Sequence, residues 1–245
     1  FKRYHHLDLI HLESLLKEQY MDYETIFVVT ESVFSMDGDY PDLKKLVELK
    51  KKYPFILILD EAHGTGVFGK TGAGLAEEMQ VQDQVDIIIG TLGKSLASMG
   101  AYVLSNSSTI IDYLINYAGE FIYSTFLSPS QVGSAESAIK ILQSSQDERE
   151  YLQNISKQFR KIINHKKQEV NIFTSPIIPI WIDNPAKILE VKNSLLQQGI
   201  IVGAVRPPTV PNNTTRLRVS LHTRVTLKTI EEISKIIKPW IKYQL

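Results

Sequence analysis

The sequence predicts an α/β fold, in which a mostly parallel sheet with flanking helices is followed by a small C-terminal α+β domain. Two short apolar runs, 55–59 and 87–89, have the length and composition of strands that are buried on both faces. Segments with a helical spacing of apolar residues alternate with such runs, which is typical of a parallel sheet. A polar junction at 144–148 ends this alternation. We therefore expect one domain over residues 1–145 and a second over residues 146–245.

The first domain is expected to alternate helices and strands. The expected order is a helix over 7–20, a strand over 24–30, a helix over 42–52, strands ending at Asp60 and just before Lys94, a strand over 100–104, a helix starting at 113 and a helix over 131–142. Leu9, Leu12, Leu15 and Leu16 recur at helical spacing in the first of these helices. Pro41 stands where a proline suits the first turn of a helix.

The second domain is expected to have a different order of elements. This order is a helix over 151–167, a strand over 177–182, a helix over 186–197, strands over 200–205 and 216–221, and a closing helix over 226–243. The regular rhythm of the first domain is lost here, which indicates a small α+β domain.

The composition excludes several classes of protein. The 245 residues include 27 Lys and Arg and 27 Asp and Glu, and this balance gives no support for nucleic acid or a membrane as the main partner. The chain has no cysteine, so disulfides and cysteine nucleophiles are excluded. Its apolar runs are far shorter than a membrane span and no secretory signal opens the sequence, so we expect a cytoplasmic location. His5, His6 and His11 lack further ligands, and no metal site is expected.

A lysine and an aspartate stand at the ends of the two buried strands. Asp60 ends one apolar run, and Lys94 follows the other within the turn 90–95. The carboxyl ends of strands are where open α/β sheets bind their ligands. This pair suits pyridoxal 5'-phosphate (PLP), which needs a lysine for a Schiff base and a partner for its pyridinium nitrogen. His63 follows Asp60 by three residues and could contact the ring oxygen or assist proton transfer.

These residues also match two other kinds of site in part. The Gly-Lys-Ser turn could belong to a phosphate-binding loop, but the required spacing is not met, because Ile88 stands five positions before Gly93. Asp60 and Glu61 could be the metal-binding carboxylates of a nucleotide hydrolase. The combination of Asp60 with Lys94 favours PLP over both.

Three motifs together resemble the α-oxoamine synthases. They are Thr-Glu-Ser-Val-Phe-Ser-Met-Asp-Gly-Asp at 30–39, Asp-Glu-Ala-His-Gly-Thr-Gly at 60–66 and Gly-Thr-Leu-Gly-Lys at 90–94. The resemblance extends from about Phe1 to the C-terminus. It implies a PLP-dependent transferase of fold type I that condenses an amino acid with an acyl-CoA, or an acyl carrier-protein thioester, and releases carbon dioxide.

The resemblance also implies roles for single residues. The expected cofactor-binding residues are Ser35, Asp60, His63, Thr91, Lys94, Ser124 and Thr125. Lys94 would carry the Schiff base, and Asp60, His63 and Lys94 would be the catalytic residues. Ser124 and Thr125 would reach the PLP phosphate of the neighbouring subunit in a homodimer. From the residues alone, this pair could instead cap the helix after Pro129.

The carboxylate of the amino-acid substrate needs an arginine. Arg206 is followed by the rigid segment 207–211, and Arg216 and Arg218 point to the same face of one expected strand. By resemblance, Arg206 and Arg218 lie near the carboxylate and Thr209 near the acyl substrate. The choice between these two arginines stays open. Arg216 is expected to be exposed on the sheet of the small domain.

The substrates are suggested by two further segments. Tyr-Ser-Thr at 123–125 and Arg-Pro-Pro-Thr-Val-Pro at 206–211 resemble the branch that joins L-alanine to a pimeloyl thioester in biotin synthesis. Branches that use glycine with acetyl-CoA, or serine with palmitoyl-CoA, are alternatives. A non-catalytic paralogue that only dimerises is a further one, although it would need neither Asp60 nor Lys94. By resemblance, members of the family carry a glycine-rich phosphate loop in a segment that precedes the position of Phe1. This chain alone is therefore not expected to be a complete catalyst.

Overall fold

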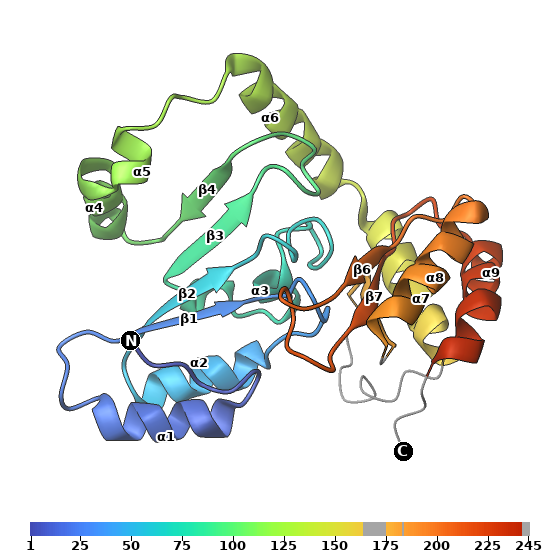
Figure 1. Ribbon diagram of the computed structural model, residues 1–245. Coiled ribbons are helices and arrows are strands. Elements are labelled where there is room, and N and C mark those ends of the chain that lie inside the picture. The colour runs from blue at the N-terminus through green and yellow to red at the C-terminus, as the bar shows by residue number, and fades with distance from the viewer. Residues whose placement is uncertain (164–174, 183, 242–245) are drawn as a thin grey trace. The chain divides into compact units, whose positions relative to one another are not determined.

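The computed structural model describes residues 1–163, 175–182 and 184–241 (Figure 1). The chain divides into two compact units. The first comprises Phe1–Val33 and Tyr40–Gln146, and the second comprises Phe34–Asp39 and Asp147–Leu245. The short segment 34–39 thus belongs with residues that follow it by more than a hundred positions.

The first unit is built on a four-stranded sheet. Its strands are β1 (Phe27–Glu31), β2 (Ile56–Asp60), β3 (Ile87–Thr91) and β4 (Ala101–Leu104), in that spatial order. The first three are parallel and β4 is antiparallel to β3. Asp60 pairs with Glu31 on one side and with Ile89 on the other. The carboxyl ends of β1, β2 and β3 therefore lie along one edge of the sheet, as the predicted mostly parallel sheet requires.

Helices precede, connect and follow these strands along the chain (Figure 1). They are α1 (Leu9–Gln19), α2 (Leu43–Lys52), α3 (Leu75–Glu78), the 3-10 turn η1 (Gln82–Gln84), α4 (Ser108–Tyr117), α5 (Gly119–Ile122) and α6 (Pro129–Gln143). Asp42 caps α2, because its carboxylate accepts the Lys45 N–H at 3.1 Å. The helix expected to start at 113 instead starts at Ser108, and the extended backbone of Ala118 separates it from α5.

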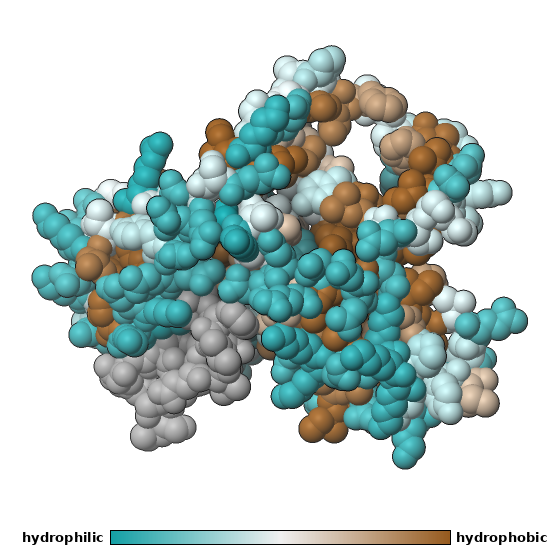
Figure 2. Space-filling view, turned by 180° about the vertical axis from the view of Figure 1, so that it is seen from behind, coloured by the Kyte–Doolittle hydropathy of each residue, from teal (hydrophilic) through white to brown (hydrophobic). Residues whose placement is uncertain are grey.

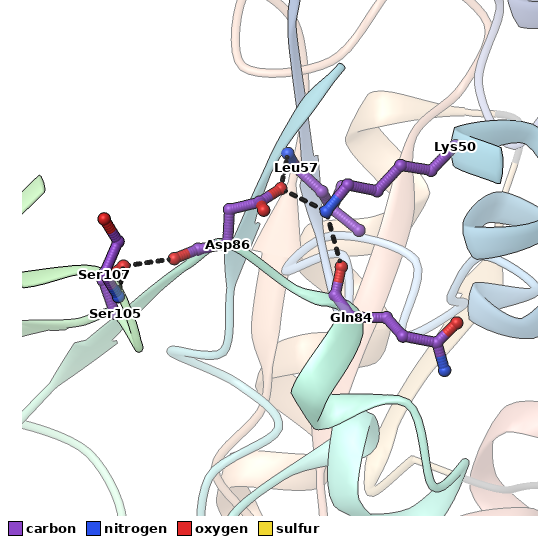
Figure 3. A network of polar contacts seen from close by, with 6 residues as sticks. All are labelled: Lys50, Leu57, Gln84, Asp86, Ser105 and Ser107. Atoms are coloured by element: carbon purple, nitrogen blue, oxygen red, sulfur yellow. Dashed lines mark hydrogen bonds and ion pairs between the residues drawn. The ribbon is translucent and has the colours of Figure 1, made fainter. Parts of the chain in front are cut away.

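A polar network ties α2 to the amino end of β3 (Figure 3). Lys50 Nζ lies 2.5 Å from Asp86 Oδ2 and donates to the Gln84 carbonyl oxygen at 2.9 Å. The Leu57 N–H of β2 donates to the same Asp86 oxygen at 2.6 Å, and Ser105 Oγ donates to the Asp86 carbonyl oxygen at 2.7 Å. The network fixes β2 and β3 at the end opposite to Asp60, so that the other ends of these strands keep a defined register.

The second unit has a three-stranded antiparallel sheet in the order β5-β7-β6. Its elements are α7 (Gln146–Ile162), β5 (Ile177–Trp181), α8 (Pro185–Gln197), β6 (Gly203–Val205), β7 (Arg216–Ser220), α9 (Leu227–Ile237) and the 3-10 turn η3 (Lys238–Trp240). Phe159, Ile178, Ile188, Leu217 and Ile230 are fully buried in one core that joins the helices to the sheet. The predicted α+β order is confirmed, while the expected helix ends 164–167 and 242–243 lie outside the described residues.

Apolar side chains are exposed on one part of the first unit. They gather over α4, α5 and the segment after α5, at the upper right of Figure 2. The members are Tyr113, Tyr117, Phe121, Ile122, Tyr123 and Phe126. Among the described helices, none has both the length and the apolar character needed to cross a membrane.

Candidate active site

The ends of β2 and β3 bring three of the expected site residues to one edge of the sheet. Asp60 is the last residue of β2 and Thr91 the last of the neighbouring parallel strand β3. Lys94 lies in the turn that follows β3, and its Nζ donates to Thr91 Oγ1 at 3.5 Å. The Lys94 side chain is exposed, whereas Asp60 and Thr91 are half-buried.

The Asp60 carboxylate is oriented by its own turn. Its Oδ1 accepts the Ala62 N–H at 2.7 Å. Its Oδ2 accepts no hydrogen bond from the described part of the chain. One oxygen therefore holds the side chain in place while the other stays available to an incoming N–H donor. These donors and acceptors fit PLP, whose protonated ring nitrogen is such a donor and whose carbonyl carbon needs an amine such as that of Lys94.

The turn that carries His63 touches the turn that carries Lys94. Gly66 has φ +80, a conformation that favours glycine. A Cβ atom at Gly66 would lie 2.5 Å from Ser95 Cβ, which is closer than real Cβ contacts. A glycine is thus needed at position 66 both for the backbone conformation and for the approach to Ser95. This contact sets the distance between the loop after β2 and the residue next to Lys94.

Glu61 is a residue of this edge that the sequence suggested only as a possible metal-binding partner of Asp60. Its side chain is fully buried, and it accepts the Leu75 N–H at 3.1 Å on Oε2 and the Ala76 N–H at 2.8 Å on Oε1. Burial raises the pKa of Glu61, and the N–H of Ala76 acts against this rise. Because both oxygens are bound to backbone donors, Glu61 does not form a metal-binding pair with Asp60.

Ser35 lies in the second unit, where β7 holds it. Arg218 Nε donates to the Ser35 carbonyl oxygen at 2.6 Å, and Arg218 Nη1 donates to Ser220 Oγ at 2.8 Å. Arg218 is half-buried, and burial lowers the pKa of its guanidinium. The structure therefore brings Arg218 and the segment of Ser35 together.

Arg216 is buried, so the expectation that it would be exposed on the sheet was wrong. Only 4% of its side chain is exposed. Its Nη1 forms an ion pair with Asp37, its Nε donates to the Thr214 carbonyl oxygen at 3.0 Å, and its guanidinium lies 3.9 Å from the centre of the Trp181 ring. The segment 34–39 and the Trp181 ring enclose this arginine, whereas the alternation of residues along β7 shows only which face it is on.

The other expected substrate residues lie after β6. Arg206 directly follows this strand and is exposed. The Thr209 N–H donates to the Arg206 carbonyl oxygen at 3.0 Å, which makes a turn, and the Thr209 side chain is exposed. The peptide bond between Pro207 and Pro208 within this turn is cis.

Ser124 and Thr125 are exposed after α5, and the alternative that they cap the next helix is wrong. Ser128 caps α6, and together with Gln131 it forms a capping box. Ser124 Oγ donates instead to the carbonyl oxygen of Glu120.

This fold, with a lysine and an aspartate at adjacent strand ends, is that of a PLP-dependent transferase of fold type I. Residues 1–237 match the family described as aminotransferase class I and II, and the chain belongs to this family. Within it, the chain is similar to the 8-amino-7-oxononanoate synthases. It is 39% identical over 234 residues to that of Chlorobaculum parvum and 40% identical over 238 residues to that of Citrifermentans bemidjiense. Each match covers 96% of this chain, and the chain spans 59% and 61% of those relatives.

Solved structures agree with this assignment. A serine palmitoyltransferase of Sphingomonas wittichii superposes with a TM-score of 0.86 at 29% identity, covering 96% of this chain and 59% of that one. An 8-amino-7-oxononanoate synthase from Francisella tularensis superposes with a TM-score of 0.82 at 33% identity, covering 97% of this chain and 68% of that one. The resemblance to the α-oxoamine synthases is thus confirmed, and PLP is the cofactor of this group.

Proposed function

We propose that the protein catalyses the decarboxylative condensation of L-alanine with a pimeloyl thioester to give 8-amino-7-oxononanoate. The observation that carries this proposal is the position of Asp60 at the end of β2 and of Lys94 in the turn after the adjacent parallel strand β3. The substrates are suggested by the relatives named 8-amino-7-oxononanoate synthase. Because the chain spans about 60% of those relatives, the activity and substrates of the whole protein are part of the proposal.

When bound, PLP would supply an electron-accepting ring that stabilises negative charge at the α-carbon of the amino acid. Asp60 Oδ2 would accept the hydrogen bond of the ring nitrogen and, as a carboxylate, keep its proton in place. Lys94 Nζ would be the point of attachment and would move the proton of the α-carbon. Thr91 Oγ1 already accepts a hydrogen bond from Lys94, so its own proton is available to the phosphate.

Arg218 is the candidate that the geometry favours for the carboxylate of the amino acid. Two of its nitrogen atoms are already held by Ser35 and Ser220, which fixes the plane of the guanidinium and leaves Nη2 to a substrate. Because Arg218 is half-buried, its guanidinium has lost part of its hydration, and an arriving carboxylate would compensate its charge. Arg206 is exposed and would need to be ordered by the substrate.

A homodimer is part of the same proposal. Exposed apolar side chains gather over α4, α5 and the segment that carries Ser124 and Thr125. Exposed apolar patches of this kind are typical of interaction surfaces. A second subunit would cover these side chains. Ser124 and Thr125 of the first subunit would then lie beside the cofactor of the second.

A second candidate is serine palmitoyltransferase activity, which the match to the Sphingomonas wittichii structure favours. The two are separated by a substrate matrix of L-alanine, glycine and L-serine with acetyl-, pimeloyl- and palmitoyl-CoA. We expect CoA release and a product of the mass of 8-amino-7-oxononanoate only with L-alanine and pimeloyl-CoA. Turnover of glycine with acetyl-CoA alone would instead indicate a glycine C-acetyltransferase.

The Lys94→Ala variant is the control for this screen. It should fold, lose the visible absorbance of attached PLP and release no CoA. Wild-type protein that neither binds PLP nor releases CoA with any pair would contradict the proposal and favour a non-catalytic paralogue.

A further inference from the structure

Glu61 connects three parts of the first unit through its backbone. Its N–H donates to the Ile89 carbonyl oxygen of β3 at 2.7 Å. Its own carbonyl oxygen accepts the N–H groups of Gly64 at 3.0 Å and Thr65 at 2.9 Å, which closes the turn that carries His63. One residue therefore joins the end of β2 to β3 and also forms the base of the His63 turn.

The Glu61 side chain adds a third connection. Its two carboxylate oxygens accept the N–H groups of Leu75 and Ala76, at the start of α3. The N–H groups of the first turn of a helix have no acceptor within that helix. Each Glu61 oxygen therefore supplies the acceptor that one of these two N–H groups would otherwise find in water. The loop between the His63 turn and α3 is in this way held at both ends by the same residue.

The space around this carboxylate fits it closely. A Cβ atom at Gly64 would lie 1.9 Å from Glu61 Oε2, and one at Gly74 would lie 2.5 Å from the same oxygen. Gly74 also has φ +128, a backbone conformation that other residues rarely adopt. Two glycines therefore leave room for an inward-facing carboxylate and for little else.

A carboxylate is the group that these donors require. A glutamine of the same shape would offer one oxygen and one NH2 group, so one backbone N–H would face another donor and lose its partner. A buried donor without a partner is costly, and a buried charge is tolerated only when it is fully hydrogen-bonded. Removal of the charge should therefore loosen the contact between the His63 turn and α3.

We propose that Glu61 is a positioning residue of the PLP site, whose carboxylate holds the turn from 61 to 65 so that Asp60 and His63 face the cofactor. The inference rests on the proposed function, because it assigns those two residues to PLP. Glu61 itself is fully buried and both of its carboxylate oxygens are bound to backbone N–H groups, so it would act through these neighbours and not by contact with the cofactor.

Glu77 provides a matched control. Its carboxylate accepts the Ala73 N–H at 3.0 Å and both the N–H, at 3.1 Å, and the Oγ1, at 3.0 Å, of Thr71. It therefore also holds a loop by backbone contacts next to α3. Among the described interactions, it makes no contact with Asp60 or with the His63 turn. Glu77→Gln therefore removes a comparable contact from a loop that does not carry Asp60 or His63.

The test compares Glu61→Gln and Glu77→Gln with the wild type at a temperature well below the unfolding of each. The Kd for PLP is measured by absorbance titration, and the pH dependence of the visible band of bound PLP is recorded. We expect Glu61→Gln to raise this Kd by about tenfold or more and to shift the titration of the band, because Asp60 and His63 set both. Glu77→Gln should leave Kd within about twofold, because Glu77 holds a loop that does not carry Asp60 or His63. Equal effects of the two variants, or a lower melting temperature of Glu61→Gln with an unchanged Kd and band, would overturn the inference.

A second measurement needs no variant and applies if Glu61→Gln does not fold. Amide hydrogen exchange is followed in the wild type with and without PLP. The N–H groups of Leu75 and Ala76 should exchange more slowly when PLP is bound, whereas those of Thr71 and Ala73 should not change. Unchanged exchange at Leu75 and Ala76 would refute the coupling. Wild-type protein that binds no PLP would instead refute the proposed function, and the inference with it.

Discussion

Replacement of Arg216 should destabilise the second unit far more than replacement of an exposed arginine. Its guanidinium lies between the Trp181 ring, at 3.9 Å, and the Asp37 carboxylate, and its Nε is bound to the Thr214 carbonyl oxygen. Arg216→Ala removes all three contacts, including the ion pair with Asp37.

The magnitude follows from the burial of the two partners. Breaking a buried ion pair costs roughly 3–5 kcal/mol of unfolding free energy, and a desolvated cation–π contact contributes about 2 kcal/mol. The Asp37 side chain is 30% exposed, so water replaces part of the lost ion pair. We therefore expect Arg216→Ala to lower the free energy of unfolding by ~3 kcal/mol in total. Arg216→Lys keeps the charge but loses the planar stack and the Nε contact, and it should cost about half as much.

The assay is urea unfolding followed by tryptophan fluorescence, in which Trp181 reports its own stacking partner. Arg224 is exposed on the same unit, and Arg224→Ala is the matched control, with an expected change within ~0.5 kcal/mol. A double-mutant cycle with Asp37→Ala should give a coupling energy of about 1–3 kcal/mol. If Arg216→Ala lowered the free energy of unfolding by no more than the Arg224→Ala control does, the reasoning would be refuted.

Three further predictions concern the first unit and the dimer. Asp60→Asn should bind PLP yet lose most turnover, because an amide can contact the ring nitrogen but cannot keep it protonated; near-normal rates would contradict this. Gly66→Ala should lower kcat and PLP affinity by displacing Ser95 beside Lys94, and a wild-type Kd for PLP would show that the turns adjust. Mixing Lys94→Ala subunits with Thr125→Ala subunits should restore activity, since half of the sites in mixed dimers would be undamaged; heterodimers without activity would show that Thr125 does not act across subunits.

The parallel strands and their functional ends could be predicted from the sequence because the signal is local. The run before Asp60 is apolar throughout, as in a strand that is covered on both faces, and the same holds for the run before Thr91 and Lys94. Once two such strands are parallel, their carboxyl ends must share an edge of the sheet. The position of Asp60 beside β3 then needs no further information from the sequence.

The burial of Arg216 could not be predicted in this way. Alternation along β7 correctly puts Arg216 and Arg218 on one face, but it does not show what covers that face. The cover comes from Asp37, which is 179 positions away, and from Trp181 on β5. A contact at such a distance leaves no periodic signal in either segment, so two arginines of the same strand look equivalent in the sequence.

The burial of Glu61 could not be predicted for a related reason. A glutamate after a strand is usually solvated, and nothing at position 61 itself indicates that its side chain turns inward. The signal lies in Gly64 and Gly74, which leave room for the carboxylate, and in the backbone donors of Leu75 and Ala76. Two glycines that follow a carboxylate residue at a strand end can therefore indicate a buried carboxylate.

The two units hold different parts of the expected chemistry, and this makes their defects separable. Asp60 and Lys94 belong to the first unit, whereas Ser35 and Arg218 are tied together within the second by the 2.6 Å contact between Arg218 Nε and the Ser35 carbonyl oxygen. Loss of Glu61 should therefore change PLP affinity before it changes the KM of the amino acid. Loss of Arg216 should do the reverse, because Arg216 lies on β7 next to Arg218, the residue proposed for the substrate carboxylate. A variant in either unit that altered both quantities equally would show that the two groups of residues are not held independently.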